Sequence, residues 1–189
     1  ATDLTRHRTE RDEFEELNLR YELATKSAGI GVWDWNIAEN VLVWDEGMHA
    51  IYGVPPDVFG GVYETWKNSV HPEDREAAET ATRQALEDVA PYDIEFRVVR
   101  PGGDVCYVEA HAVIVRDDAG TPLRMVGVNF DVTREKQAEE ALRRRERFFN
   151  TVIQTTSDGF WVVDSEGRLT EVNDAYCAMS GYSREEFED

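Results

Sequence analysis

GVWDWNIAENVLVWDEGMHAIYGVPPDVF, residues 31–59, and GFWVVDSEGRLTEVNDAYCAMSGYSREEF, residues 159–187, are two versions of one pattern. They align without a gap, and the matched positions are Gly31 with Gly159, Trp33 with Trp161, Asn36 with Asp164, Asp45 with Asn173, Ala50 with Ala178, Gly53 with Gly181 and Phe59 with Phe187. A repeat of this length indicates one structural unit present twice. The second copy reaches only Asp189, so we expect it to hold the beginning of that unit without its last three strands.

Several repeated residues have a direct physical interpretation. Asp45 and Asn173 each follow a predicted strand and precede a predicted helix. A side-chain oxygen at that position can accept hydrogen bonds from the free N–H groups of the first helical turn, so we predict both as helix caps. Gly53 and Gly181 stand where that helix should end, a position that favours positive φ.

Working outward from the first copy, strand and helix signals follow one another in a simple order. Residues 29–37 and 41–44 predict a hairpin, and short helices and a longer helix beginning at HPEDR follow. In that stretch we predict His71 as a cap and Pro72 at the first helical position. Ala77, Ala81 and Ala85 with Leu86 predict a small-residue face. Three alternating strands then follow between tight turns, which favours antiparallel neighbours. The predicted fold class is α+β, a single sheet with helices on one face and further helices at both ends.

Polar helices flank this domain. Residues 1–26 carry a narrow apolar stripe at spacings of three and four, formed by Phe14, Leu17, Tyr21 and Ala24. That helix either lies on its own domain or forms half of a parallel dimer seam. Residues 133–155 predict a connector helix that is solvent-bridging or a dimeric coiled coil, although Arg145 falls where a seam would want an apolar residue. The predicted order is helix 1–26, domain 27–132, connector 133–155 and a partial second domain 156–189.

The amino-acid composition limits the classes of function that the chain can have. The chain carries 39 Asp and Glu against 20 Lys and Arg, for a net charge of -19, which disfavours nucleic acids and anionic membranes as partners. Cys106 and Cys177 form no CxxC motif, which fits a reducing compartment, and no stretch approaches the length of a membrane span. We therefore expect a cytoplasmic region. Both ends look like cuts within a longer polypeptide, so membrane anchoring of the parent stays open.

These motifs together resemble the PAS family of sensor domains. The WDWN hairpin, IYG, HPEDR and NFDVTREK match one PAS subfamily over about residues 20–133, and the second copy matches the general pattern over about residues 148–189. The resemblance implies a five-stranded antiparallel sheet of order 2-1-5-4-3, with a ligand or protein-contact site between sheet and helices. It also implies output through the helix after the last strand, with Asp131 and Thr133 joining the two. Both are good caps in their own right, and we favour the coupling role.

Aromatic residues are the candidates for a ligand site. Trp33, Trp35, Trp44 and Trp66 could line a pocket, with space left by Ala110, Ala112 and Gly127. The alternative, which we favour, is that the tryptophans fill the core. Asn129 could be a polar contact for a ligand or could equally bond to the backbone. The long helix has no histidine to hold a haem iron, no cysteine lies in an NCRFLQ-like stretch for a flavin adduct, and the histidines show no metal-ligand spacing. A non-covalent flavin or another small metabolite stays open.

No nucleophile–base arrangement, P-loop or dinucleotide fingerprint is present, so we assign no catalytic residue to the chain. The sequence predicts a sensing and relay module, dimeric through its flanking helices, that passes a signal to a C-terminal histidine kinase. The alternatives are the PAS region of a diguanylate cyclase or phosphodiesterase, and a ligand-free dimerisation spacer. A transcriptional regulator is a further class, but its DNA-binding helices would have to lie outside this chain.

Overall fold

The computed structural model describes residues 2–183 and 186, with side chains from residue 15 onward. Phe14, in the stripe of the first helix, and Phe187, in the repeat, therefore lie outside the described side chains. The chain divides into two compact units, Ala1–Arg134 and Glu135–Asp189, and each is described by itself.

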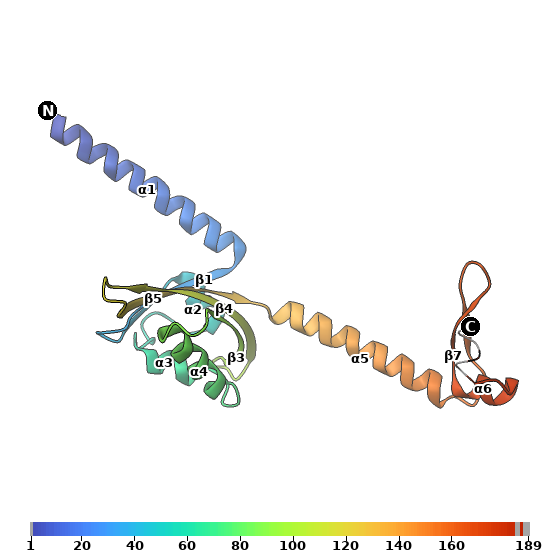
Figure 1. Ribbon diagram of the computed structural model, residues 1–189. Coiled ribbons are helices and arrows are strands. Elements are labelled where there is room, and N and C mark those ends of the chain that lie inside the picture. The colour runs from blue at the N-terminus through green and yellow to red at the C-terminus, as the bar shows by residue number, and fades with distance from the viewer. Residues whose placement is uncertain (1, 184–185, 187–189) are drawn as a thin grey trace. The chain divides into compact units, whose positions relative to one another are not determined.

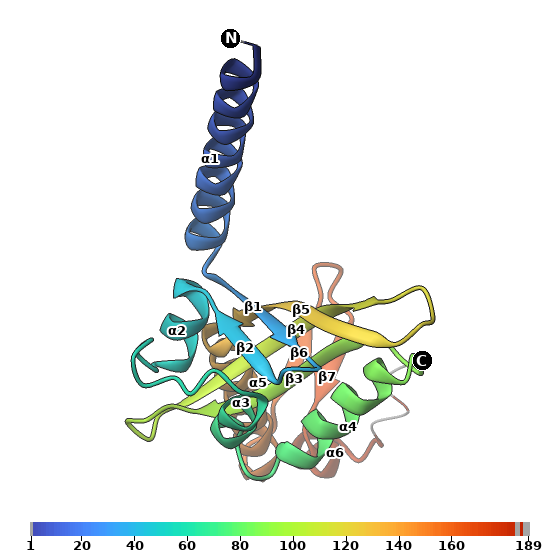
Figure 2. The same cartoon turned by 90° about the vertical axis from the view of Figure 1, so that its left-hand side faces the viewer.

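The first unit is a five-stranded antiparallel sheet, and all of its helices except the first lie on one face (Figures 1 and 2). Its elements are α1 Thr2–Ala28, β1 Ile30–Asn36, β2 Val41–Trp44, α2 Glu46–Tyr52, α3 Tyr63–Ser69, α4 Arg75–Leu86, β3 Tyr92–Val99, β4 Val105–Arg116 and β5 Pro122–Asp131. The strand order β2-β1-β5-β4-β3 confirms the order that the resemblance implies. The last strand, β5, lies in the centre of the sheet between β1 and β4.

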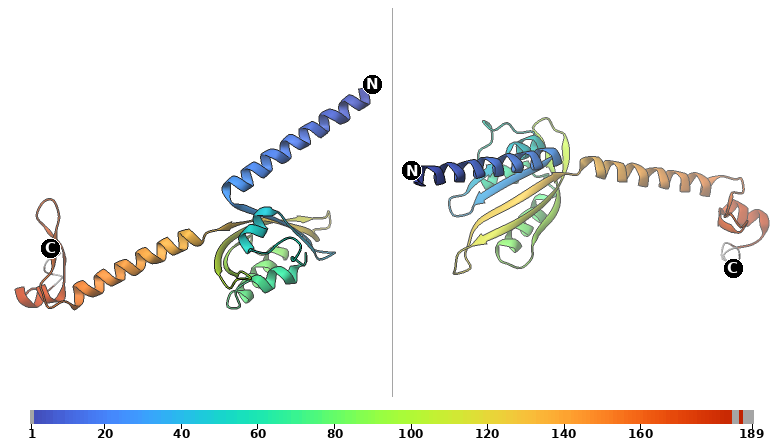
Figure 3. Two further views of the ribbon diagram at one scale, coloured as in Figure 1. Left: turned by 180° about the vertical axis from the view of Figure 1, so that it is seen from behind. Right: turned by 90° about the horizontal axis from the view of Figure 1, so that it is seen from above.

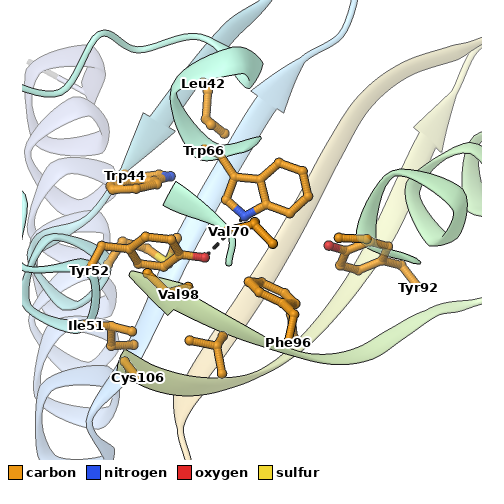
Figure 4. Close-up of a cluster of buried hydrophobic side chains, with 14 of the residues drawn as sticks. Leu42, Trp44, Ile51, Tyr52, Trp66, Val70, Tyr92, Phe96, Val98 and Cys106 are labelled. Carbon is orange, nitrogen blue, oxygen red and sulfur yellow. Dashed lines mark hydrogen bonds between the residues drawn. The ribbon is translucent and has the colours of Figure 1, made fainter. Parts of the chain in front are cut away.

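Alternation along the strands builds the core. Every second residue of β3 and β4 points to the helical side, where Phe96, Val98, Cys106 and Val108 are all buried. Helices α2, α3 and α4 cover this side, and Figure 4 shows Tyr52 of α2 and Trp66 of α3 among the aromatic side chains of the sheet. The opposite face of the sheet carries none of these three helices (Figure 3).

The beginning of α4 differs from the prediction. The helix begins at Arg75 rather than at Pro72, and its N-cap residue is Asp74, so the assignment of His71 as the cap is wrong. His71 lies in the preceding turn, where its Nδ1 accepts from the Glu73 N–H at 3.3 Å. The reason is tertiary, because the Asp74 carboxylate binds the backbone N–H of Arg97 on β3 at 2.8 Å, which fixes this turn against the sheet.

The buried face of α4 agrees only in part with the predicted small-residue face: Ala81, Ala85 and Leu86 are buried or half-buried. Ala77 is exposed, whereas Ala78, Thr82 and Ala85 are buried and Ala81 packs beside them. Thr82 is tolerated inside because its hydroxyl donates to the Ala78 carbonyl at 2.9 Å. Small side chains on this face let the helix lie close to the sheet.

The second unit repeats the opening of the first. Helix α5, Thr133–Thr155, leads into a hairpin of β6, Trp161–Val163, and β7, Leu169–Val172, followed by α6, Asp174–Ser180. Gly181 ends α6 with φ of 80°, as Gly53 ends α2 with φ of 66°. In this hairpin Val172, which corresponds to Trp44 of the first copy, is buried, whereas Trp161, which corresponds to Trp33, is 54% exposed.

Candidate functional site

A small cavity lies between the sheet and the helices of the first unit. It has a volume of about 20 Å³ and is lined by Trp33, Trp35, Leu42, Trp44, Tyr63, Trp66, Thr82, Tyr92 and Met125. All four tryptophans predicted as pocket candidates therefore meet around one space, although they come from β1, β2 and α3. A cavity of this size holds about one water molecule, whereas pockets for small-molecule ligands have several hundred cubic ångströms. The aromatic side chains fill most of the space in this conformation.

A buried hydrogen-bond network borders the cavity and centres on Tyr52 at the end of α2. The Tyr52 hydroxyl accepts from Trp66 Nε1 at 3.2 Å and from Asn129 Nδ2 at 2.9 Å. Asn129 Oδ1 in turn accepts from Trp33 Nε1 at 2.8 Å. Figure 4 shows the Tyr52–Trp66 contact among the core side chains. The network joins α2, α3, β1 and β5, so a shift of one of these elements strains the others.

Asn129 is occupied by the protein itself. Its side chain is 1% exposed, and both its amide nitrogen and its oxygen are already bonded to aromatic side chains. The sequence offered a ligand contact or a backbone bond for this residue, and the structure shows a third partner, the side chains of Trp33 and Tyr52. A ligand that contacted Asn129 without breaking these bonds could use only its second N–H group or the second lone pair of its oxygen.

Trp44 carries the one buried side-chain donor that has no hydrogen-bond partner in the described part of this core. Its Nε1–H group is buried without a hydrogen-bond partner among the described residues, and its ring is stacked on Phe59 with 3.8 Å between centroids. An unpaired buried N–H group is costly and calls for an acceptor. Because Trp44 lines the cavity, a water or a ligand oxygen placed there would satisfy it.

The remaining residues predicted for a ligand pocket pack in or beside this core. Trp35 stacks on Tyr63 with 4.7 Å between ring centroids, and its Nε1 donates to Asn40 Oδ1 at 3.1 Å. Gly127 lets the Trp33 ring lie against the backbone, since a Cβ there would come within 2.4 Å of Trp33 Cζ2. Ala110 is buried and Ala112 packs at the edge of the core. The small residues thus hold an aromatic ring rather than leave free volume.

Burial controls the ionisation of the phenols. It raises the pKa of Tyr52 well above its usual value, with hydrogen bonds from Trp66 and Asn129 acting in the opposite direction. Burial likewise raises the pKa of Tyr92. Both phenols stay neutral across the physiological range, so they act here as hydrogen-bonding groups and not as bases.

The junction between β5 and α5 is built from hydrogen bonds. Thr133 Oγ1 accepts from the Tyr107 N–H on β4 at 2.9 Å and donates to Cys106 Sγ at 3.5 Å. Asp131 Oδ1 accepts from the Thr133 N–H at 3.0 Å. The first residue of α5 is thereby fixed to the sheet by side chain and backbone alike.

Arg100 connects this junction to the helical layer. Its Nε donates to the Ile51 carbonyl in α2 at 2.7 Å, and a terminal nitrogen donates to Asp131 Oδ2 at 2.9 Å. Burial acts to raise the pKa of Asp131, but hydrogen bonds from Thr133, Cys106 and Arg100 outweigh it and hold that pKa below its usual value. The carboxylate is therefore charged at neutral pH and remains a partner for Arg100.

Two contributors to the site escaped prediction from the sequence. Tyr52, the centre of the network, stands directly before Gly53, and its spacing of four from Met48 could have marked it as inward-facing. Arg100 follows β3 in an apparent turn and carried no local signal of its role. Its two partners are distant in the sequence, and only the fold brings them together.

Helix α4 has no histidine to ligate iron, and the cavity is far smaller than a flavin ring system. Among the described residues, no group of three or more His, Cys, Asp or Glu side chains could hold a metal ion. Within the same range, no helix has both the length and the apolar character required to cross a bilayer.

Comparison with known proteins gives the family. Residues 41–129 match the family model described as PAS fold, and residues 147–189 match one described as PAS domain. A crystal structure of a sensory box histidine kinase/response regulator from Burkholderia thailandensis E264 is 31% identical, with a TM-score of 0.60 over 70% of this chain and 98% of that one. The chain belongs to the PAS family. Its sheet order and helical layer are those of a PAS domain, as the repeat and its motifs predict.

Relatives of this PAS chain are signalling proteins. It is 31% identical to a probable diguanylate cyclase of Escherichia coli K12 over 172 residues, which is 91% of this chain and 15% of that protein. It is 28% identical to the sensor protein FixL of Bradyrhizobium diazoefficiens over 163 residues, or 86% of this chain and 32% of that protein. The chain thus spans less than a third of either relative. It is a PAS sensor region with a role in signalling.

Proposed function

We propose that this PAS chain senses a change in its first domain and passes it through the β5–α5 junction to an output domain that follows in the parent protein. The observation that carries the proposal is the chain of contacts from Ile51 through Arg100 and Asp131 to Thr133. It connects the end of α2, where Tyr52 accepts a hydrogen bond from the cavity residue Trp66, to the first residue of α5. A relay requires an element that can adopt two arrangements, and we propose that this chain of contacts is that element.

The path has a simple mechanical basis. Tyr52 directly follows Ile51, so a ligand or partner that displaces the Tyr52 network also moves the Ile51 carbonyl that Arg100 binds. Arg100 can keep both of its bonds only if Asp131 moves with it. Thr133, held by Asp131 on one side and by Tyr107 of β4 on the other, then changes the direction or rotation of α5.

The test is substitution at the junction in the full-length parent. Thr133→Val keeps the side-chain shape and removes the oxygen that the Tyr107 N–H binds, while Asp131→Ala removes the partner of Arg100. We expect each to change the basal output activity several-fold, because each breaks a bond that fixes α5 to the sheet.

A matched control lies in the same helix. Thr151→Val makes the same chemical change in α5, where the hydroxyl only donates to the Arg147 carbonyl. It should leave output unchanged. If the parent, the Thr133→Val variant and the Asp131→Ala variant all give equal output, the relay through the β5–α5 junction is refuted. The chain would then act as a spacer.

We propose the activity of the output domain from the relatives to which this chain is similar. The Burkholderia structure and FixL favour a histidine kinase, measured as autophosphorylation from ATP. The similarity to the probable diguanylate cyclase supports cyclic di-GMP synthesis from GTP as the second candidate. Assaying the parent with both nucleotides distinguishes them, since each product forms from one nucleotide alone.

We propose dimerisation through α1 and α5 as part of this function. Leu142, Phe149 and Val152 are 58%, 48% and 46% exposed along α5, and this spacing fits a helical seam. Arg145, which interrupts the seam, lies with its guanidinium carbon 5.5 Å from the Phe149 ring centroid and covers it. Native mass spectrometry of the chain should give a dimer, and Leu142→Glu should give a monomer; a monomeric unsubstituted chain would refute the seam.

A small ligand with an oxygen acceptor is our proposed occupant of the first domain, on the strength of the orphaned Trp44 N–H group. Binding requires the aromatic walls to separate, because the cavity is only about 20 Å³. An absorption spectrum and native mass of the purified chain would reveal a retained ligand, whereas a bare protein favours the ligand-free spacer. We place the region in the cytoplasm, consistent with the unpaired Cys106 and Cys177.

A further inference from the structure

The residue that caps the short helix makes the same core contacts in both copies of the repeat. In the first copy, Asp45 Oδ1 accepts from the Met48 N–H at 2.8 Å, which caps α2, and from the Val32 N–H of β1 at 2.9 Å. The Asp45 N–H also donates to the Val32 carbonyl at 3.0 Å. One oxygen atom thus joins the strand to the helix.

The second copy repeats this arrangement bond for bond. Asn173 Oδ1 accepts from the Tyr176 N–H at 2.9 Å and from the Phe160 N–H at 2.8 Å. The Asn173 N–H donates to the Phe160 carbonyl at 3.0 Å. Aspartate and asparagine are therefore interchangeable as far as this oxygen is concerned.

The other half of the side chain differs. Asn173 Nδ2 donates to the Ile153 carbonyl in the last turn of α5 at 2.8 Å and to the Asp158 carbonyl at 2.9 Å. Carbonyls in the last turn of a helix have no partner within the helix, so this amide caps the end of α5 while its oxygen caps the start of α6. Asn173 is 0% exposed and fastens α5 to the domain that follows it.

Asp45 cannot do this for α1. The repeat places Thr25 and Ile30 where the second copy has Ile153 and Asp158, but a carboxylate has no N–H group to donate to their carbonyls. A negative charge beside the C-terminal end of a helix is also unfavourable. The charge is felt at α1, where burial and the Asp45 carboxylate together raise the pKa of Tyr21.

Other contacts hold α1 weakly. A groove of about 550 Å³ separates α1 from β1 and α2, lined among others by Tyr21, Thr25 and Asp45. The ion pair between Lys26 and Glu46 spans 3.2 Å, but the two side chains are 74% and 85% exposed. Pairs of this kind contribute little to stability.

We propose that the residue at this position sets how firmly each helix is fastened to the sensor domain after it: Asn173 makes the end of α5 rigid with the second domain, and Asp45 leaves α1 as a hinge. The inference stands on the comparison of the two copies and does not depend on the relay through Thr133. It follows that the second domain moves rigidly with α5, whereas the first domain does not follow most of the motion of α1.

Exchanging the two residues tests the proposal, with amide hydrogen exchange of the whole chain as the readout. Asp45→Asn supplies the missing N–H donors and should slow exchange in residues 22–28 about tenfold, the size expected for one or two new hydrogen bonds. Asn173→Asp should speed exchange in residues 150–155 by a similar factor. Asp57→Asn, which removes one charge from an exposed loop, should change neither segment.

The exchange rates of the three variants support or refute the proposal. Unchanged exchange in residues 22–28 of Asp45→Asn would overturn the proposal, because the capping oxygen is retained and the fold of the first domain is preserved. If Asn173→Asp removes protection throughout residues 157–183, the second domain has unfolded and the Asp45→Asn result alone decides. Slower exchange at 22–28 in the Asp57→Asn control would likewise refute it, by showing that net charge rather than the new donor is responsible.

Discussion

Replacing Asn129 by leucine is the most direct test of how the core of the first domain is held together. The side chain is fully buried in the central strand, and leucine has the same branched shape but no hydrogen-bonding group. The change removes the bond from Trp33 Nε1 at 2.8 Å and the bond to the Tyr52 hydroxyl at 2.9 Å. At about 1 kcal/mol for each bond, and about 1–2 kcal/mol for leaving the Trp33 N–H unpaired, we expect a loss of roughly 3–4 kcal/mol.

The assay is urea unfolding followed by tryptophan fluorescence, since Trp33, Trp35, Trp44 and Trp66 all lie in this core. Tyr52→Phe provides the second arm of a double-mutant cycle. Because the two side chains share one bond, the double variant should be less destabilised than the sum of the singles by about 1 kcal/mol. A cost below about 0.5 kcal/mol for Asn129→Leu, or strict additivity, would refute the network as a source of stability.

Two further predictions concern the fit of the sheet and its response to acid. Gly127→Ala should destabilise the first domain by about 3 kcal/mol, since the new Cβ would overlap the Trp33 ring, and a normal thermal midpoint would contradict this. The pKa of Asp74 is lowered by hydrogen bonds from Arg97, so its contribution is present above the unfolded-state pKa near 4 and disappears as pH falls through the lower folded value. Asp74→Asn should therefore cost about 1.5–3 kcal/mol at pH 7 and much less near pH 2.5, and an equal cost at both pH values would disprove the charged pairing.

The sequence by itself determined the elements and their repetition. Alternating apolar residues specify strands because side chains on a strand point to opposite faces, and this signal needs no distant partner. The caps at Asp45 and Asn173 and the glycines at Gly53 and Gly181 are equally local, since they act on backbone groups within one helical turn. Because these local signals occur in the same order twice, the PAS fold could be recognised from the sequence.

Only the tertiary structure decided which side chains meet. Trp33 and Asn129 lie 96 residues apart, and they touch because β5 returns to the centre of the sheet beside β1. The same long-range pairing filled most of the predicted pocket with aromatic rings and gave Arg100 its place between α2 and the output helix. It also started α4 at Arg75 rather than Pro72. Contacts of this kind depend on strand register and packing, which no local pattern encodes.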